Sequence, residues 1–508
     1  MSARIDAERP RVIVTTDLEV DDMNSLIHLA LYLNLLDVEA FVYTASQYHF
    51  LGDGEHTLGE VTPCWRTKGR RAYEWRPVPH EPDPEAGRLM RYRPFPEGWM
   101  ERLWMEEYAE AWPHLNENAA AAGEPAFPAP ADLVRRTYRG NVAFEGDVRQ
   151  DTEGSDAIRR AILDDDPRTL WLLSWGGMNT IVRALMSIAE EFSRTPSWER
   201  VRGRVYRKVR VLGVTDGVGQ DNSWLDHGAT CYPDLVFWRV PYVYGSYLDA
   251  VSAQPDSIEL FRAPWPKRML IDGNGPLMAR YMLYGDGKVY EGEPGRFQFG
   301  RHATLDWGFE GMDPIVFTPG DAMAEGDSMT YIPLLPFGLR GTDDSSFDTL
   351  LGPMFRDGEE PPVASGASSA GFGSPVEKNV NPYLRAYQED FAARAQWCAH
   401  GSETCNHAPI VDEVSEDVVA LPGESVRLRA AAHDPDGDEV FARWFVAPGS
   451  TSYAGSHQLD AWGAEGFEAS FVVPADAVPG ERFVLTLAVR DAARRPMTRY
   501  VQVAIAVA

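Results

Sequence analysis

The chain has 508 residues, 44% hydrophobic and 24% charged, and its 76 acidic against 48 basic residues give a formal charge of −28. This length exceeds what one hydrophobic core usually covers, so two domains are expected, and the composition is typical of a globular protein. A field this negative repels phosphate backbones, so nucleic acid is excluded as an expected partner. The basic run at 202–210 is expected to be a solvated face.

The N-terminal residues 1–10 carry no apolar stretch and no cleavage-site pattern, and no window of about 18 apolar residues predicts a membrane span. As written, the sequence is typical of a cytoplasmic protein, although a secreted protein with its signal peptide removed would look the same. The four cysteines are too few for a disulfide framework. Cys64 and Cys231 are expected to be ordinary thiols, and a bridge between Cys398 and Cys405 is the less favoured alternative to two free thiols. No Cys/His spacing predicts a zinc site.

The first half of the chain alternates strand and helix patterns. A β-branched run at 12–14 predicts a strand buried on both faces, and apolar residues at helical spacing predict a helix over 21–34. A strand at 38–44 completes a strand-helix-strand unit. The alternation recurs with a helix at 157–163, a strand at 170–173, a turn and helix over 176–185, and strands at 209–214 and 235–238. The predicted fold class is α/β with a doubly wound, mainly parallel sheet.

Two further regions complete the predicted organisation. An aromatic, proline-rich insertion at about 62–151 is too long for an ordinary connection and is expected to be a helical excursion over the sheet edge. The small polar residues of 364–374 predict a flexible loop, and 382–400 predicts a helix. β-Forming segments then predict a small immunoglobulin-like sandwich, with strands at 426–432, 441–446, 468–473, 483–489 and 500–507. The predicted domains are therefore an α/β domain over 1–400 and a β-sandwich over 406–508.

Three carboxylates, Asp17, Asp21 and Asp22, lie between the end of the first strand and the start of the first helix. Ligands of open α/β sheets bind at the carboxyl ends of strands, and carboxylates crowded there repel one another unless a cation offsets the charge. Oxygen ligands favour calcium or magnesium over zinc. Asp21 or Asp22 alone would be assigned as a helix cap or a partner of the helix dipole, but the three together favour a metal site.

The segment Thr-Thr-Asp-Leu-Glu-Val-Asp-Asp at 15–22 resembles the calcium-binding motif of nucleoside hydrolases, in which an Asp is followed four and five residues later by an Asp pair. The wider chain is similar to a bacterial family of nucleoside hydrolase-like proteins described as cellulose-binding. The supporting stretches span nearly the full length: Asp21-Asp-Met-Asn-Ser-Leu26, Ser174-Trp-Gly-Gly-Met-Asn-Thr180, Asn274-Gly-Pro-Leu277, Glu325-Gly-Asp-Ser328 and Asn406-His-Ala-Pro409.

The resemblance implies a Ca²⁺ ion held by the carboxylates of Asp17, Asp22 and Asp327 and by the backbone carbonyl of Trp175. It implies that Asp21 hydrogen-bonds sugar hydroxyls and that Asp17 is the base for a metal-bound water. Glu325 is the nearest family-matched acid for the leaving group, and the weaker options are His302, Asp306 and Asp313. The remaining expected substrate-binding residues are Gln47, Asn179, Asn274 and Trp307.

The sequence also departs from the nucleoside hydrolase pattern. Leu18-Glu19 stands where those enzymes have Pro-Gly, and Thr15 replaces an Asp. Ser46 or Gln47 stands near the position of a metal-site Asn. Gly326 occupies the position of a His that helps to protonate a leaving purine. The metal and sugar half of the site is therefore expected to be retained, and the nucleobase half is not.

The function indicated is a calcium-dependent glycoside hydrolase acting on a furanoside or oligosaccharide through a metal-activated water. The alternatives are a non-catalytic protein that binds a cellulose-like glycan and an N-ribosyl hydrolase, which Gly326 disfavours. A phosphohydrolase is disfavoured because Thr15 stands where its nucleophilic Asp would be. The partner expected is a sugar or glycan, and homo-oligomerisation is left open. Residues 433–438, His-Asp-Pro-Asp-Gly-Asp, lack EF-hand spacing and predict a tight turn.

Overall fold

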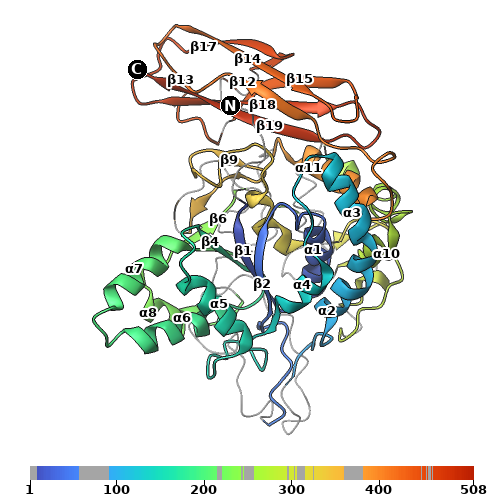
Figure 1. The fold of residues 1–508 in the computed structure, drawn as a ribbon, viewed down its shortest axis with the longest axis vertical. Coiled ribbons are helices and arrows are strands. Elements are labelled where there is room, and N and C mark those ends of the chain that lie inside the picture. The colour runs from blue at the N-terminus through green and yellow to red at the C-terminus, as the bar shows by residue number, and fades with distance from the viewer. Residues whose placement is uncertain are drawn as a thin grey trace.

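The structure is a computed structural model that describes residues 9–55, 91–213, 220–241, 244, 257–293, 297–301, 304–305, 315–323, 325–357, 359, 381–447, 449–453, 455, 459 and 462–508. An α/β body carries a β-sandwich on one side (Figure 1). None of the helices in these residues is long and apolar enough to cross a membrane.

The body is built on a seven-stranded sheet in the order β11-β6-β5-β4-β1-β2-β3. Every neighbouring pair is parallel except β11 with β6, which confirms the predicted mainly parallel sheet. From β1 the chain adds β2 and β3 on one side, and from β4 it adds β5 and β6 on the other. The direction in which strands are added therefore reverses between β1 and β4. Ligands of doubly wound sheets bind beyond the strand ends at such a reversal. The strands are β1 (Arg11–Thr16), β2 (Asp37–Tyr43), β3 (Thr137–Arg139), β4 (Leu170–Ser174), β5 (Val209–Gly213), β6 (Phe237–Arg239) and β11 (Phe355–Arg356).

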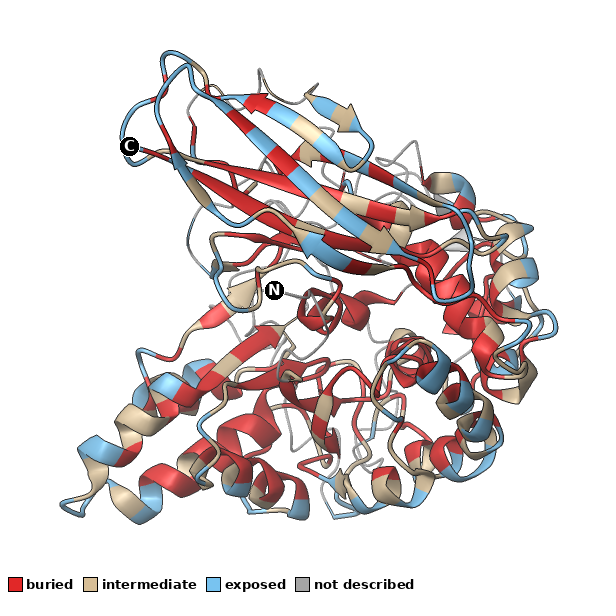
Figure 2. Ribbon diagram, turned by 45° about the horizontal axis from the view of Figure 1, so that its top comes forward, coloured by how far each residue is buried: buried red, intermediate tan, exposed pale blue. Residues whose placement is uncertain are grey.

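Successive residues of β1 enter two different cores because side chains alternate between the faces of a strand. Val12 and Val14 pack in the core that holds helices α1 (Val20–Ala30), α3 (Ala109–Ala121) and α11 (Leu384–Trp397). Ile13 packs on the opposite face with α5 (Glu153–Leu163), α6 (Asn179–Phe192) and α7 (Trp198–Lys208). Figure 2 shows the sheet and the helix faces against it as buried. Burial on both faces explains the apolar run in the sequence.

Shorter elements connect these layers. The helical ones are α2 (Trp99–Leu103), η2 (Trp104–Tyr108), α4 (Pro130–Arg135), η3 (Trp224–Gly228), α8 (Ala229–Cys231), η4 (Ile258–Leu260), η5 (Lys267–Ile271), α10 (Gly275–Arg280), η7 (Phe299–Arg301), η8 (Gly326–Thr330) and η9 (Ile332–Leu334). Two small hairpins add β7 (Thr304–Leu305), β8 (Ile315–Val316), β9 (Asp348–Thr349) and β10 (Gly352–Pro353).

The first helix is shorter than the predicted 21–34. It ends at Ala30, and the amides of Leu31 and Tyr32 bond carbonyls three residues earlier, so the chain tightens into buried turns. Arg394 of α11 donates to the Leu31 carbonyl at 3.3 Å. A tertiary partner therefore takes over a carbonyl that a longer helix would have used, and apolar spacing cannot signal this.

The described part of the insertion supplies α2, η2, α3 and α4, as expected, and also β3, which was not predicted. β3 pairs in parallel with β2 at the sheet edge. Trp104 anchors the insertion by packing on Phe41, with ring centroids 5.0 Å apart. The strand has three residues, too few to show a periodicity. Cys64, Trp65, Trp75 and the predicted loop at 364–374 lie outside the described residues.

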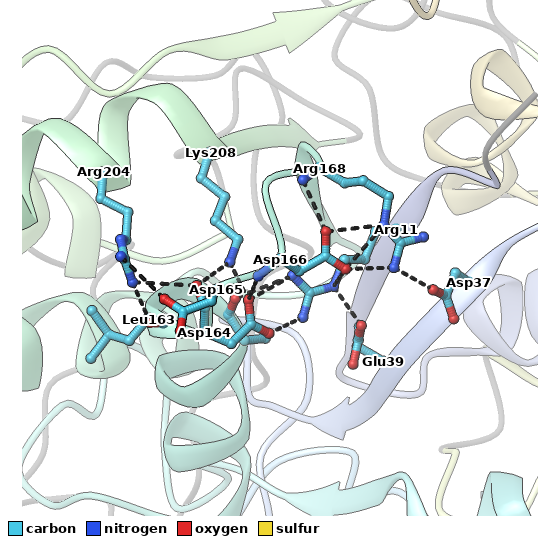
Figure 3. Close-up of polar contacts among 11 residues, drawn as sticks. Arg11, Asp37, Glu39, Leu163, Asp164, Asp165, Asp166, Arg168, Arg204 and Lys208 are labelled. Atoms are coloured by element: carbon cyan, nitrogen blue, oxygen red, sulfur yellow. Dashed lines mark hydrogen bonds and ion pairs between the residues drawn. The ribbon is translucent and has the colours of Figure 1, made fainter.

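An ion-pair network ties the N-terminal ends of the strands together (Figure 3). Arg11, at the start of β1, pairs with Glu39 and Asp164, and Arg168 pairs with Asp37 at 2.8 Å. Lys208 at the end of α7 also pairs with Asp164, and its side chain is 6% exposed. The prediction of a solvated face at 202–210 is therefore wrong for Lys208, because Asp164 draws it inward.

The C-terminal β domain pairs a three-stranded sheet with a five-stranded one, as expected for a sandwich. Trp444, Phe471 and Phe483 lie in the core between them. Cys398 and Cys405 are free thiols that donate to the carbonyls of Arg394 and His400, so the alternative of a disulfide is wrong. The strands are β12 (Ile410–Val414), β14 (Ser425–His433) and β17 (Glu468–Val472) in one sheet, and β13 (Val418–Ala420), β19 (Thr498–Val507), β18 (Arg482–Asp491), β15 (Val440–Val446) and β16 (Gly463–Glu465) in the other.

The sandwich is seated on α11 through polar and aromatic contacts. Arg499 of β19 donates to Asp390 at 2.8 Å, and the Tyr500 amide donates to the Phe337 carbonyl at 2.9 Å. The Tyr500 ring lies edge-on to that of Tyr383, 5.1 Å between centroids. These contacts are buried, so the two parts of the chain share an ordered interface.

Candidate metal centre

The candidate site lies where the strand order reverses. β1 and β4 run side by side with Thr15 opposite Ser174, and the Trp175 amide donates to the Thr15 carbonyl at 2.8 Å. A Cβ atom at Gly176 would lie 2.9 Å from the Cβ and backbone nitrogen of Asp17. Only glycine permits this approach, which brings the chain after β4 directly against the chain after β1.

Three carboxylates converge beside this strand end. Asp21 and Asp22, in the first turn of α1, and Asp327 in η8 each offer an oxygen within 4.8 Å of the others. Asp22 also accepts a hydrogen bond from the Thr16 hydroxyl. The structure therefore brings the distal Asp327 to the Asp pair, as the resemblance implied.

Asp17 lies next to this cluster with both carboxylate oxygens buried. Within the described residues neither oxygen has a hydrogen-bond partner of normal geometry, although Ser46 lies near enough to lower the pKa of Asp17. One oxygen of Asp327 is buried and unpartnered as well. A buried carboxylate without donors is unfavourable unless a cation or a proton compensates. These orphaned oxygens fit a calcium ion held by oxygen ligands.

The crowding of the carboxylates raises their proton affinity. Burial raises the pKa of Asp17 to about 6, against the opposing attraction of His49 and with a smaller contribution from the Glu19 charge. Burial and the Glu19 charge raise the pKa of Asp21 to about 8. Burial and neighbouring aspartates raise the pKa values of Asp22 and Asp327 well above the ordinary range. At neutral pH the cluster therefore favours a bound positive charge.

A buried ion cluster lies near Asp17 and Asp21, and its Glu19 charge raises the pKa of both. Arg93 donates to Glu19 at 2.6 Å and to Glu293 at 2.7 Å, and His49 Nε2 lies 3.3 Å from Glu293 and 3.6 Å from Glu19. Burial lowers the pKa of His49, but the two glutamates outweigh burial and raise it. Leu18 adopts the left-handed region at φ 58°, which is rare for a residue with a side chain.

Trp175 holds the helix that carries Asp327. Its indole nitrogen donates to the Thr330 hydroxyl at 2.6 Å, and that hydroxyl donates to the Asp327 carbonyl at 2.8 Å. Trp175 is 1% exposed. The side chain therefore positions η8, and a role for its backbone carbonyl as a metal ligand stays a prediction.

Glu325 does not occupy the position expected of a leaving-group acid. Its carboxylate accepts from the Tyr281 hydroxyl, lies 2.6 Å from His28 Nδ1 and accepts from Ser328 at 2.7 Å. Glu325 is 1% exposed, and His28 belongs to α1. Both carboxylate oxygens are thus engaged, and Glu325 fastens η8 to α1.

The other predicted substrate-binding residues are less well placed. The Asn179 side chain accepts from Thr44 at 2.6 Å and donates to the Asn141 carbonyl at 2.7 Å, so it joins the starts of two loops. The Asn274 amide donates to two carbonyls of η5, so the structure gives it a helix-capping contact instead of a sugar contact. Gln47 lies buried in the loop after β2, near Asp17's neighbour Ser46. Trp307, His302, Asp306 and Asp313 lie outside the described residues.

Sequence reasoning missed the ion cluster and the hydroxyls that support the aspartates. Glu19, Arg93 and Glu293 come from distant segments whose meeting no local pattern encodes. The Thr-Thr pair before Asp17 carried a usable signal, since a hydroxyl six residues before Asp22 is well placed to cap its carboxylate. Thr330 carried no such signal, because its hydrogen-bond partner, Trp175, is 155 residues away in the sequence.

The strand reversal at β1 and β4, the aspartates beyond it and the appended sandwich define a nucleoside hydrolase-like α/β protein with a C-terminal β domain. Residues 11–352 match the family described as cellulose-binding Sde182, nucleoside hydrolase-like domain, and residues 425–507 match the C-terminal domain of cellulose-binding protein Sde0182. The chain belongs to this family, which confirms the resemblance seen in the sequence.

A solved structure shares the whole architecture. It is a nucleoside hydrolase-related protein from Saccharophagus degradans, described as associated with carbohydrate metabolism. The similarity covers 99% of this chain and 100% of that chain, with a TM-score of 0.63 and 21% identity. Identity at this level establishes the fold alone. No curated protein matches the chain.

Proposed function

We propose that this protein is a calcium-dependent glycoside hydrolase acting on a furanoside or an oligosaccharide. The observation that carries the proposal is the pair of unpartnered, buried carboxylate oxygens of Asp17 beside the cluster of Asp21, Asp22 and Asp327. Simple structural aspartates accept hydrogen bonds or pair with cations. Neither oxygen of Asp17 has a hydrogen bond of normal geometry within the described residues, and among them only Ser46 and the more distant His49 and Arg93 charges favour its ionised form, so it is available to a ligand and to a water.

Each residue of the site has a separate role in this proposal. Asp17, Asp22, Asp327 and the Trp175 carbonyl would hold the calcium, and Asp21 would accept hydrogen bonds from the sugar hydroxyls. A bound calcium would supply a grip on vicinal hydroxyls and a more acidic water. Asp17 would take the proton of that water as its oxygen attacks the anomeric carbon, while the glycosidic bond breaks with its electron pair going to the leaving oxygen, which takes a proton from solvent.

Hydrolysis requires a proton for the leaving oxygen, and the Glu325 carboxylate is already engaged by Tyr281, His28 and Ser328. The lack of an identified acid favours a second candidate function. A non-catalytic glycan-binding protein would need the metal and Asp21 for its grip but would need no acid. The cellulose-binding description of the family supports the same reading. An N-ribosyl hydrolase is less well supported, because Gly326 stands where a purine-protonating His would be.

The test measures turnover of aryl furanosides, aryl pyranosides, cello-oligosaccharides and nucleosides with calcium and after chelation. Asp22→Asn should abolish turnover, and Asp165→Asn is the matched control because its fully exposed side chain lies at the opposite end of the sheet. Turnover that persists in Asp22→Asn would refute the metal mechanism. Calcium-dependent glycan binding without turnover would establish the binding protein instead.

A further inference from the structure

Three separate chain segments meet where the body passes into the sandwich. The linker supplies Asn406, whose amide nitrogen donates to Asp491 and to the Arg495 carbonyl, both at 3.0 Å. The turn between β14 and β15 supplies Asp434, and the turn after β18 begins at Asp491. Asp434 accepts the backbone amides of residues 436 and 438 at 2.8 and 3.2 Å, so the tight turn predicted there does form.

Two buried oxygens at this junction have no partner among the described residues: Asp434 Oδ2 and Asn406 Oδ1. The two residues are 9% and 8% exposed. The orientation of the Asn406 amide is fixed, because both neighbours of its nitrogen are acceptors. Its oxygen must therefore face away from Asp491 and the Arg495 carbonyl, on the side that has no donor.

The two carboxylates of the junction have no close ion pair among the described residues, although Asp491 accepts three hydrogen bonds and interacts with the Arg490 charge at longer range. No Lys, Arg or His nitrogen of the described chain lies within 4.0 Å of the carboxylates of Asp434 or Asp491, although Asp491 is only 1% exposed. Burial and the nearby Asp434 charge raise the pKa of Asp491. Two buried carboxylates that feel each other's charge, with two orphaned oxygens, match the environment that hard cations occupy in proteins.

We propose that Asp434 and Asn406 are ligands of a second divalent cation site, of the calcium class, with Asp491 as its charge partner. A carboxylate and an amide oxygen favour calcium over zinc, and calcium tolerates an irregular set completed by waters. The ligands come from the linker and from a turn of the sandwich, so the site is not an EF-hand loop. This explains why the spacing within 433–438 did not reveal it.

The proposed cation would fix the sandwich to the body. Asn406 is followed by His407, whose backbone and ring nitrogens contact Asp436 at 2.7 and 2.8 Å and whose Nε2 lies 3.1 Å from Asn118 of α3. The Trp397 indole of α11 donates to the Asn406 carbonyl at 3.0 Å. Binding at Asn406 therefore stiffens a segment that already touches two helices of the body.

The test uses the full chain with the first site disabled by Asp22→Asn and Asp327→Asn, so that its outcome is independent of the proposed catalysis. Calorimetric titration of the chelated protein should find one calcium site. Adding Asp434→Asn should raise the calcium Kd of that site at least tenfold, because a charged ligand is lost. Asp412→Asn is the control, because its exposed carboxylate pairs with His433 on the same sandwich. Absence of calcium binding in the disabled background, or binding that Asp434→Asn leaves intact, would overturn the proposal.

Terbium luminescence locates the site even if Asp434→Asn does not fold. Terbium bound at Asn406 should be excited through Trp397, whose indole contacts that residue. Trp397→Phe in the disabled background should therefore remove most of the sensitised emission while calorimetry still finds a calcium site. Sensitised emission that Trp397→Phe leaves unchanged would place the ion elsewhere and overturn the proposal.

Discussion

Replacing Asp17 by Asn should stabilise the protein when calcium is absent and destabilise it when calcium is present. Asp17 is 1% exposed, and its pKa rises from an ordinary 3.8 to about 6. The difference of about 2 corresponds to about 3 kcal/mol, at about 1.36 kcal/mol for each pKa unit. A carboxylate with a raised pKa in the folded state favours folding while protonated, and this contribution disappears as pH rises through about 6.

At about pH 8 without calcium, Asp17→Asn should therefore raise the free energy of unfolding by up to about 3 kcal/mol, and at about pH 4 by nearly nothing. Calcium should reverse the sign, because the variant has lost a ligand while the wild type gains the binding energy. Urea unfolding of the chelated protein at both pH values measures the effect, with Asp165→Asn as the control. A variant that is no more stable than wild type at the higher pH, without calcium, would refute the reasoning.

Three other predictions concern the same site. Calcium affinity should fall steadily as pH drops from about 8 to about 5 in calorimetric titrations, because Asp17 is a proposed ligand and its raised pKa of about 6 lets protons compete with the cation. Glu325→Gln should cost about 2–4 kcal/mol in urea unfolding and weaken calcium binding, since the carboxylate that fastens η8 to α1 is lost; unchanged stability would contradict the fastening role. Thr330→Val should cost about 1–2 kcal/mol and alter the tryptophan emission, because the acceptor of the Trp175 indole is removed.

The parts of the fold that were predicted from the sequence are those determined by interactions between residues close together in the chain. β1 is buried on both faces, so its residues are all apolar or β-branched after Arg11, and the next helix starts with acidic residues in its first turn. Asp17, Asp21 and Asp22 share one strand end and helix start, so their proximity follows from local chain geometry. Asp327 had no such cause and was placed only by family resemblance.

The parts that the sequence did not predict depend on tertiary partners. Glu325 has the chemistry of an acid catalyst, but His28 and Tyr281 bind its carboxylate from segments far along the chain. Lys208 lies in a basic run typical of solvated helices, but Asp164 at the end of another helix draws it inside. In both cases the residue type indicates what the side chain can do, but the sequence does not show which distant residue binds it.

The ion cluster beside Asp17 bears on whether the leaving group is a nucleobase or a sugar. Pro-Gly, the nucleoside hydrolase sequence at this point, has no charged side chain, whereas Glu19 binds Arg93 and lies 3.6 Å from His49. The groups next to Asp17 are thus charged and rich in hydrogen-bonding atoms, and the weakly polar ring faces of a nucleobase gain little from packing against them. A hydroxylated sugar can exchange its water hydrogen bonds for bonds to such groups. We infer that Leu18-Glu19, which stands where nucleoside hydrolases have Pro-Gly, makes the surroundings of Asp17 better suited to a polar glycan, which favours an O-glycoside or a bound glycan over a nucleoside.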